Sequence, residues 1–120
     1  MSTPAASHYL LLLRHSGTMP KPDEMAKLMA KFKVWMDGIK TRGEFVATNG
    51  LEFTGRVVRT HGKVSDGPFV EAKEMVGGYI IVAAASLDRA TEIAQSCPGL
   101  EQPGTTVEVR PIRSSPHSST

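Results

Sequence analysis

The chain has 120 residues, of which 40% are hydrophobic and 22% charged, and its formal net charge is +2. This length suggests one domain, and the weak, scattered charge argues against a nucleic-acid partner, which needs a clustered basic face. One cysteine excludes an internal disulfide, and the longest apolar run is far shorter than the ~20 residues of a membrane-spanning helix. We therefore predict a cytoplasmic protein with no membrane partner.

Two short end segments, residues 1–7 and 114–120, are small, polar and proline-bearing. We expect both to be disordered tails around one domain at residues 8–113. The domain opens with a predicted strand at residues 8–15, in which leucines alternate with leucines and Tyr9, so both of its faces are apolar. A strand of this kind is expected to be covered on both sides.

Residues 22–43 predict a helix, with Pro22 in its first turn and Gly43 as its stop. Its apolar residues recur at the three-to-four spacing of one helical stripe, comprising Met25, Leu28, Met29, Phe32, Trp35, Met36 and Ile39. A stripe so rich in methionine and aromatic residues can line a cofactor pocket, but a core-facing role is the commoner use.

Three further extended segments follow the helix. Residues 44–50 form a short predicted strand, and residues 55–65 read as a hairpin with His61 and Gly62 at its bend. Residues 77–85 predict a second strand that is apolar on both faces, and its leading glycines favour a bulge or a close backbone approach.

The chain closes with a second helix and an amphipathic strand. Residues 86–99 predict the helix, capped by Ser86, with Cys97 as a small core residue on its buried stripe. Residues 105–112 predict a strand in which Val107 and Val109 share one face, as suits a sheet edge.

This order is β-α-β-β-α-β with an extra hairpin, the ferredoxin-like arrangement of the α+β class. The two doubly apolar strands are expected to be central, with both helices on one face of the sheet. The other face would expose a large apolar patch on a monomer. We therefore predict a homodimer in which two sheets pack face to face with twofold symmetry.

The segment DGPFVEAKEMVGGY, residues 66–79, resembles the signature of the YCII-related family, in its DGPF branch. The opening YLLLLRH and the closing VEVRP segments are also similar to that family. The resemblance implies a dimeric α+β barrel. It further implies either acid/base chemistry, because a His/Asp pair lines a cleft in the wider family, or an accessory role beside extracytoplasmic-function sigma factors.

Asp66 and His61 are the candidate catalytic residues. The Asp66 carboxylate can either close an Asx-type turn or project into a cleft as a general acid/base. His61 can exchange protons at neutral pH, but it is also a natural turn residue before Gly62. A metal held by Asp66, His61 and Glu71 matches no recognised ligand spacing, so we expect no metal and no cofactor.

Four further residues are candidates for ligand binding: Phe69, Glu71, Lys73 and Arg14. Phe69 can anchor the turn to the core or stack on a ligand. Glu71 and Lys73 can form a solvated surface, or point inward so that the ammonium group fixes an anion. We predict that the protein binds a small polar or anionic ligand near Asp66, with a sigma-factor-related regulatory partner as the alternative.

Overall fold

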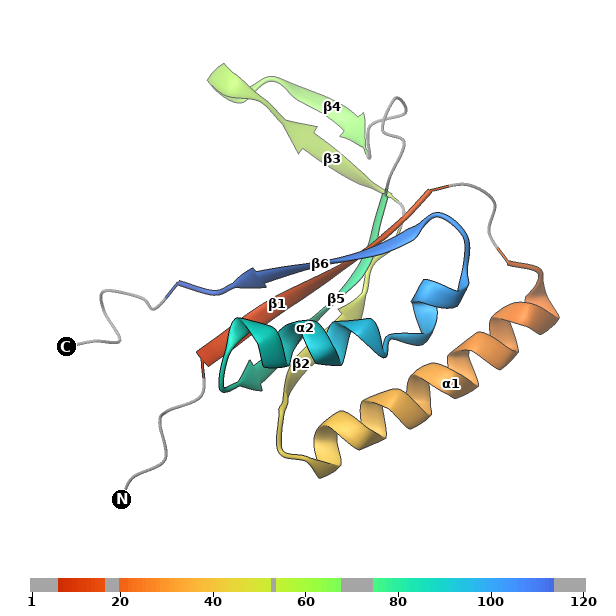
Figure 1. Ribbon diagram of the computed structural model, residues 1–120. Helices are drawn as coiled ribbons and strands as arrows, with labels where there is room; N and C mark the ends of the chain where they lie inside the picture. The colour runs from red at the N-terminus through yellow and green to blue at the C-terminus, as the bar shows by residue number, and fades with distance from the viewer. Residues whose placement is uncertain (1–6, 17–19, 53, 68–74, 114–120) are drawn as a thin grey trace.

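The computed structural model of the chain describes residues 7–16, 20–52, 54–67 and 75–113. Six strands, two α-helices and two short 3₁₀ turns occur in these ranges (Figure 1). In chain order they are β1 (Ser7–His15), α1 (Pro22–Thr41), β2 (Phe45–Gly50), β3 (Gly55–Val58), a 3₁₀ turn (Thr60–Gly62), β4 (Val64–Gly67), β5 (Met75–Ala84), α2 (Leu87–Gln95), a 3₁₀ turn (Pro98–Glu101) and β6 (Thr105–Pro111).

Four of the strands form one antiparallel sheet in the order β2-β5-β1-β6. The prediction that the two doubly apolar strands are central is therefore confirmed. The predicted β-α-β-β-α-β order is confirmed as well. The extra hairpin, β3 and β4, forms a separate two-stranded sheet that projects beyond one end of the main sheet (Figure 1).

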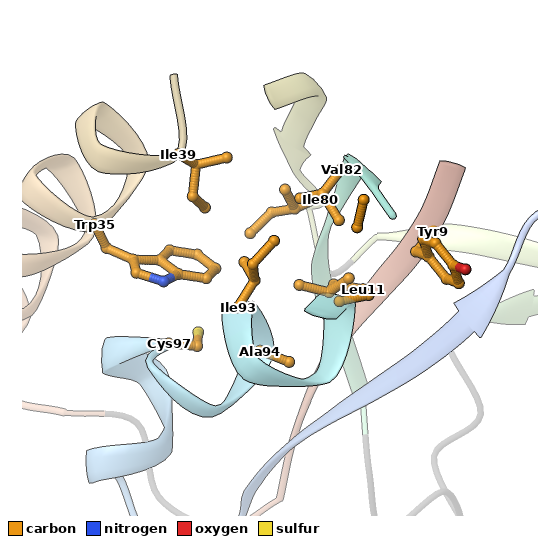
Figure 2. Packing of buried hydrophobic residues seen from close by; sticks show 11 residues of the cluster. Tyr9, Leu11, Trp35, Ile39, Ile80, Val82, Ile93, Ala94 and Cys97 are labelled. Carbon is orange, nitrogen blue, oxygen red and sulfur yellow. The ribbon is translucent and has the colours of Figure 1, made fainter. Parts of the chain in front are cut away.

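Both helices lie on the same face of the four-stranded sheet (Figure 1). The strand register places Leu11 opposite both Ile80 and Val109, and Tyr9 opposite Val82, on this helix-facing side. Trp35 and Ile39 from α1 and Ile93 from α2 point toward these strands (Figure 2). The hydrophobic core is thus a single layer between the helices and the sheet.

The helix α1 ends where glycine permits a left-handed residue. Gly43 has φ +73°, the Gly43 N–H donates to the Lys40 carbonyl, and the Glu44 N–H donates to the Ile39 carbonyl. These two bonds form a Schellman motif. The predicted stop at Gly43 is therefore confirmed, and it turns the chain directly into β2.

The apolar stripe of α1 is less completely buried than its spacing predicts. Leu28, Trp35 and Ile39 are buried, but the Met29 side chain is 50% exposed. Phe32 and Met36 pack against the core only in part. The spacing shows which face of a helix is apolar, but not how closely each turn approaches the sheet.

Two glycines shape the start of β5. The β1–β5 register passes from Leu13 opposite Gly78 to Arg14 opposite Val76, so Gly77 is the extra residue of a bulge. A Cβ atom at Gly78 would lie 3.1 Å from the Asn49 carbonyl oxygen of β2. Both predicted uses of these glycines, a bulge and a close backbone approach, are therefore confirmed.

The helix α2 is capped as predicted, because the Ser86 side chain accepts a hydrogen bond from the Arg89 N–H at 3.1 Å. At its other end the Trp35 indole donates to Ser96 Oγ at 2.8 Å, which joins the two helices. The helix ends at Gln95, and Pro98 then begins a 3₁₀ turn that the sequence pattern does not predict. Cys97 is buried in the core, as expected.

Glu44 connects the end of α1, the start of β2 and the helix α2. Its carboxylate accepts two hydrogen bonds from Arg89 at 2.8 Å and one from Arg42 at 2.9 Å. The bonds from Arg89, opposed by partial burial and assisted by Arg42, lower the pKa of Glu44 from 4.5 to about 2. The charged form of Glu44 is therefore favoured by folding.

We predict that Glu44→Gln lowers the free energy of unfolding at pH 7 by about 1–3 kcal/mol, since charge-assisted hydrogen bonds to Arg89 are lost. The folded-state pKa lies below the unfolded one. The contribution of Glu44 is therefore complete above pH 4.5 and is lost as the pH falls toward 2. Denaturant unfolding of the wild type and Glu44→Gln should show that their difference in free energy of unfolding shrinks as the pH falls through this range. Glu92→Gln, which removes an exposed partner of Arg89, serves as the control, and a constant difference would contradict the prediction.

Candidate functional site

The hairpin that carries two of the predicted site residues is short and regular. Arg56 stands opposite Asp66 and Val57 opposite Ser65 in the β3–β4 register. The Asp66 side chain is exposed, so its carboxylate is open to solvent in the single chain. A guanidinium and a carboxylate in opposed strand positions leave the middle of the hairpin electrically balanced.

His61 occupies the bend of the hairpin in a left-handed conformation. Its φ is 67°, and that of the following Gly62 is 76°. The bend is closed by hydrogen bonds from the Gly62 N–H to the Arg59 carbonyl and from the Arg59 N–H to the Lys63 carbonyl. Histidine adopts this conformation less readily than glycine, so the bend holds His61 at a local conformational cost.

The structure therefore places Asp66 and His61 on one hairpin, with both side chains exposed. Neither is among the residues that line the two cavities between α1 and the sheet. The other candidates from the same motif, Phe69, Glu71 and Lys73, lie outside the described residues. The cleft predicted near Asp66 stays a prediction.

Arg14 lies apart from the hairpin, on the central strand β1. Its Nε and Nη2 groups donate to Glu108 Oε1 on β6, at 3.2 and 2.9 Å. Glu108 also lies 3.8 Å from Arg110, so a short row of charges runs along this border of the sheet. Arg14 is therefore held in position by a neighbouring strand while part of its guanidinium stays exposed.

The face of the sheet opposite the helices is apolar at its centre. Leu10 stands opposite Ile81, and Leu12 opposite Tyr79, on the two central strands. These side chains are only half-buried, and no helix in the described ranges covers them. We call this surface, made by Leu10, Leu12, Tyr79 and Ile81, the open face.

Two adjoining cavities lie between α1 and the sheet, with volumes of about 200 and 270 Å³. Four residues line both of them: Leu13, Met29, Phe32 and Gly77. The smaller cavity extends to Arg14, His15 and Thr105, where His15 Nδ1 lies 3.0 Å from Thr105 Oγ1. The larger one extends toward Asn49 and Tyr79.

Sequence reasoning did not locate these cavities as a candidate site. The sequence feature that indicates them is the methionine and aromatic stripe of α1, for which a core-facing role is the commoner use. Trp35 and Ile39 do fill the core, and Leu28 is buried but lines the smaller cavity. Met29 and Phe32 instead stand at the cavities, a difference that depends on the distance between the helix and the sheet.

Other chemistry is sparse in the described ranges. No group of three or more histidine, cysteine, aspartate or glutamate residues there could hold a metal ion. Neither described helix is long and apolar enough to cross a membrane. Burial raises the pKa of the Cys97 thiol from 9.0 to about 11, against weaker opposing hydrogen bonds from the Gly99 and Leu100 backbone. Cys97 is therefore a poor nucleophile in the folded chain.

A four-stranded antiparallel sheet, two helices on one face and a hairpin inserted before β5 define a split β-α-β protein of the α+β class. Comparison with protein families is more specific, because residues 8–115 match the YCII-related domain. The chain therefore belongs to the YCII-related family, which confirms the resemblance at that level. No curated protein matches the chain in sequence.

We predict that Cys97 reacts slowly with a thiol reagent such as Ellman's reagent in the native protein. The rise in pKa alone reduces the thiolate population at pH 8 by roughly 100-fold, and burial of the sulfur restricts access further. The measurement compares reaction rates in buffer and in guanidinium chloride. Equal rates in the two solutions would show that Cys97 is accessible in the native state.

Proposed function

We propose that the protein acts as a homodimer that binds a small polar or anionic ligand beside the β3–β4 hairpin. The observation that carries this proposal is the hairpin itself, which bears Asp66 and pairs with no strand of the four-stranded sheet. An isolated two-stranded hairpin is marginally stable in water, so it needs a surface to pack against. A second copy of the chain would supply that surface.

Apolar exposure on the hairpin supports the same arrangement. The Val58 and Val64 side chains are 68% and 61% exposed, and they stand opposite each other in the β3–β4 register. The pair lies between the bend at His61 and the opposed Arg56 and Asp66. Covering these valines by a partner protomer would bring Asp66 and His61 against that protomer and screen them from water.

The open face provides the larger contact surface for such a dimer. Leu10, Leu12, Tyr79 and Ile81 form its apolar centre, and the Arg14–Glu108 ion pair lies along one border. A face of this kind, apolar at the centre and charged at the rim, is typical of protein interfaces. Twofold packing of two open faces would give the dimeric α+β barrel expected for this fold.

Within this dimer, Asp66 is the proposed acid/base or ligand-orienting group, and His61 is its proposed partner. Arg14 can attract an anion, because Glu108 engages only its Nε and Nη2 groups among the described contacts. Phe69, Glu71 and Lys73 follow Asp66 closely in the sequence and are proposed to complete the ligand contacts. Acid/base catalysis at Asp66 and the polar or anionic character of the ligand are both part of this proposal.

We predict that the wild-type protein sediments at twice the 12.9 kDa mass of the chain, and that Leu10→Arg shifts it toward the monomer. A charge introduced at the centre of the open face would be buried without a partner in the dimer. Sedimentation velocity over a concentration series measures this change. The matched control is Val34→Arg on α1, where the side chain is 72% exposed. A monomeric wild type would contradict the dimer.

We predict that a screen of polar and anionic metabolites by thermal shift identifies a compound that stabilises the wild type but not Asp66→Asn. The substitution keeps the size of the side chain and removes its charge. Glu52→Gln, a second exposed carboxylate outside the hairpin, should behave as the wild type. If both variants respond as the wild type does, Asp66 is not part of the site. Co-purification of a sigma-factor-related protein, without a ligand, would favour the regulatory alternative.

A further inference from the structure

We propose that the space between the first half of α1 and the sheet is a second binding site, for a small cyclic apolar molecule whose polar group is neutral or anionic. This site lies on the helix-facing side of the sheet, away from the open face. Neither Asp66 nor His61 lines it. Neither of these two residues is therefore needed to form it, although Arg14 and Tyr79 belong both to its lining and to the surface of the proposed dimer.

The size of the space supports this assignment. The two cavities measure about 200 and 270 Å³ and share four lining residues, so they adjoin one another. An apolar cavity of about 150 Å³ is already large enough to hold benzene. Together the two cavities reach the range of about 300–1,000 Å³ that is usual for ligand pockets. One substituted six-membered ring fits either part.

The walls are apolar and adaptable. Met25, Met29 and Phe32 of α1 form one wall of the smaller cavity, and Leu13 of β1 contributes to the other. Methionine side chains are flexible and polarisable, and they make favourable contacts with aromatic rings. Because Met29 is half-exposed, a bound ring would allow it to bury surface that now faces water.

The polar residues of the lining determine which polar group on a ligand fits the site. His15 stands at one end of the smaller cavity, and the described residues that line the two cavities include no aspartate, glutamate or lysine. The Arg14 guanidinium pairs instead with Glu108, on the side of β6 opposite the core-facing Val107 and Val109. The hydrogen-bonding residues Gln102 and Thr105 also line the smaller cavity. A cationic ligand would find no carboxylate among the described lining residues, so a hydroxyl or a carboxylate group suits this part of the site better.

Gly77 makes the site testable, because it lines both cavities. A Cβ atom placed there meets no atom of the described residues within 4 Å, and the residue does not have a positive φ. A larger side chain at this position can therefore occupy empty space without straining the backbone. Gly55 on the hairpin has the same two properties and lines neither cavity, which makes it the matched control.

The experiment titrates the wild-type protein, carrying ¹³C-methyl methionine, with phenol, phenylacetate and phenethylamine. These probes share a ring and differ in the charge of the polar group. We expect saturable shifts of the Met25, Met29 and Met36 methyl signals with phenol or phenylacetate, and weaker binding of phenethylamine. Met75, at the start of β5 and outside both linings, should not shift.

Gly77→Leu should weaken binding of the best probe by about tenfold or more, whereas Gly55→Leu should leave it unchanged. If Gly77→Leu does not give the native spectrum, Met29→Trp replaces it as the variant that fills the cavities and should weaken binding. Val34→Trp, on the exposed side of α1, is then the control. The site is overturned if no probe gives saturable shifts, if Met75 shifts equally, or if the cavity variants bind as the wild type does. Equally tight binding of phenethylamine would overturn the charge selection. None of these readouts depends on Asp66 or on dimer formation.

Discussion

Apolar side chains on both faces of β1 and β5 are the constraint on which this structure depends. Successive residues of a strand point to opposite sides, so Leu11 enters the core beneath the helices while Leu10 and Leu12 emerge on the open face. The two helices can cover only one of these sides. The apolar side chains that remain on the open face favour association with a partner, and the dimer proposal follows from this.

The order of elements could be predicted well from the sequence because local signals agreed with one another. Pro22 and Gly43 bound the first helix, Ser86 caps the second, and His61 with Gly62 forms the hairpin bend, as the structure has them. Alternation along the strands also identified which two are central. Each of these features depends on residues close together in the chain.

What could not be predicted depends on distances between elements. The apolar spacing of α1 identifies its inner face, but it does not say that Trp35 and Ile39 reach the core while Met29 borders a cavity. The contact of Glu44 with Arg89 likewise joins residues 45 positions apart in the chain. The strand register fixes the position of Asp66 but not its role, because its carboxylate is exposed in the single chain.

The close approach of β2 to Gly78 limits which side chains can be accommodated near this edge of the sheet. A Cβ atom at residue 78 would lie 3.1 Å from the Asn49 carbonyl oxygen, a contact so tight that the end of β2 would have to shift by a few tenths of an ångström to accept a methyl group. An edge strand is normally the part of a sheet that tolerates change most easily. Here the end of β2 packs directly against the side of Gly78 that carries no side chain, so a substitution at residue 78 would act first on the last pairs of the β2–β5 ladder and not on the core.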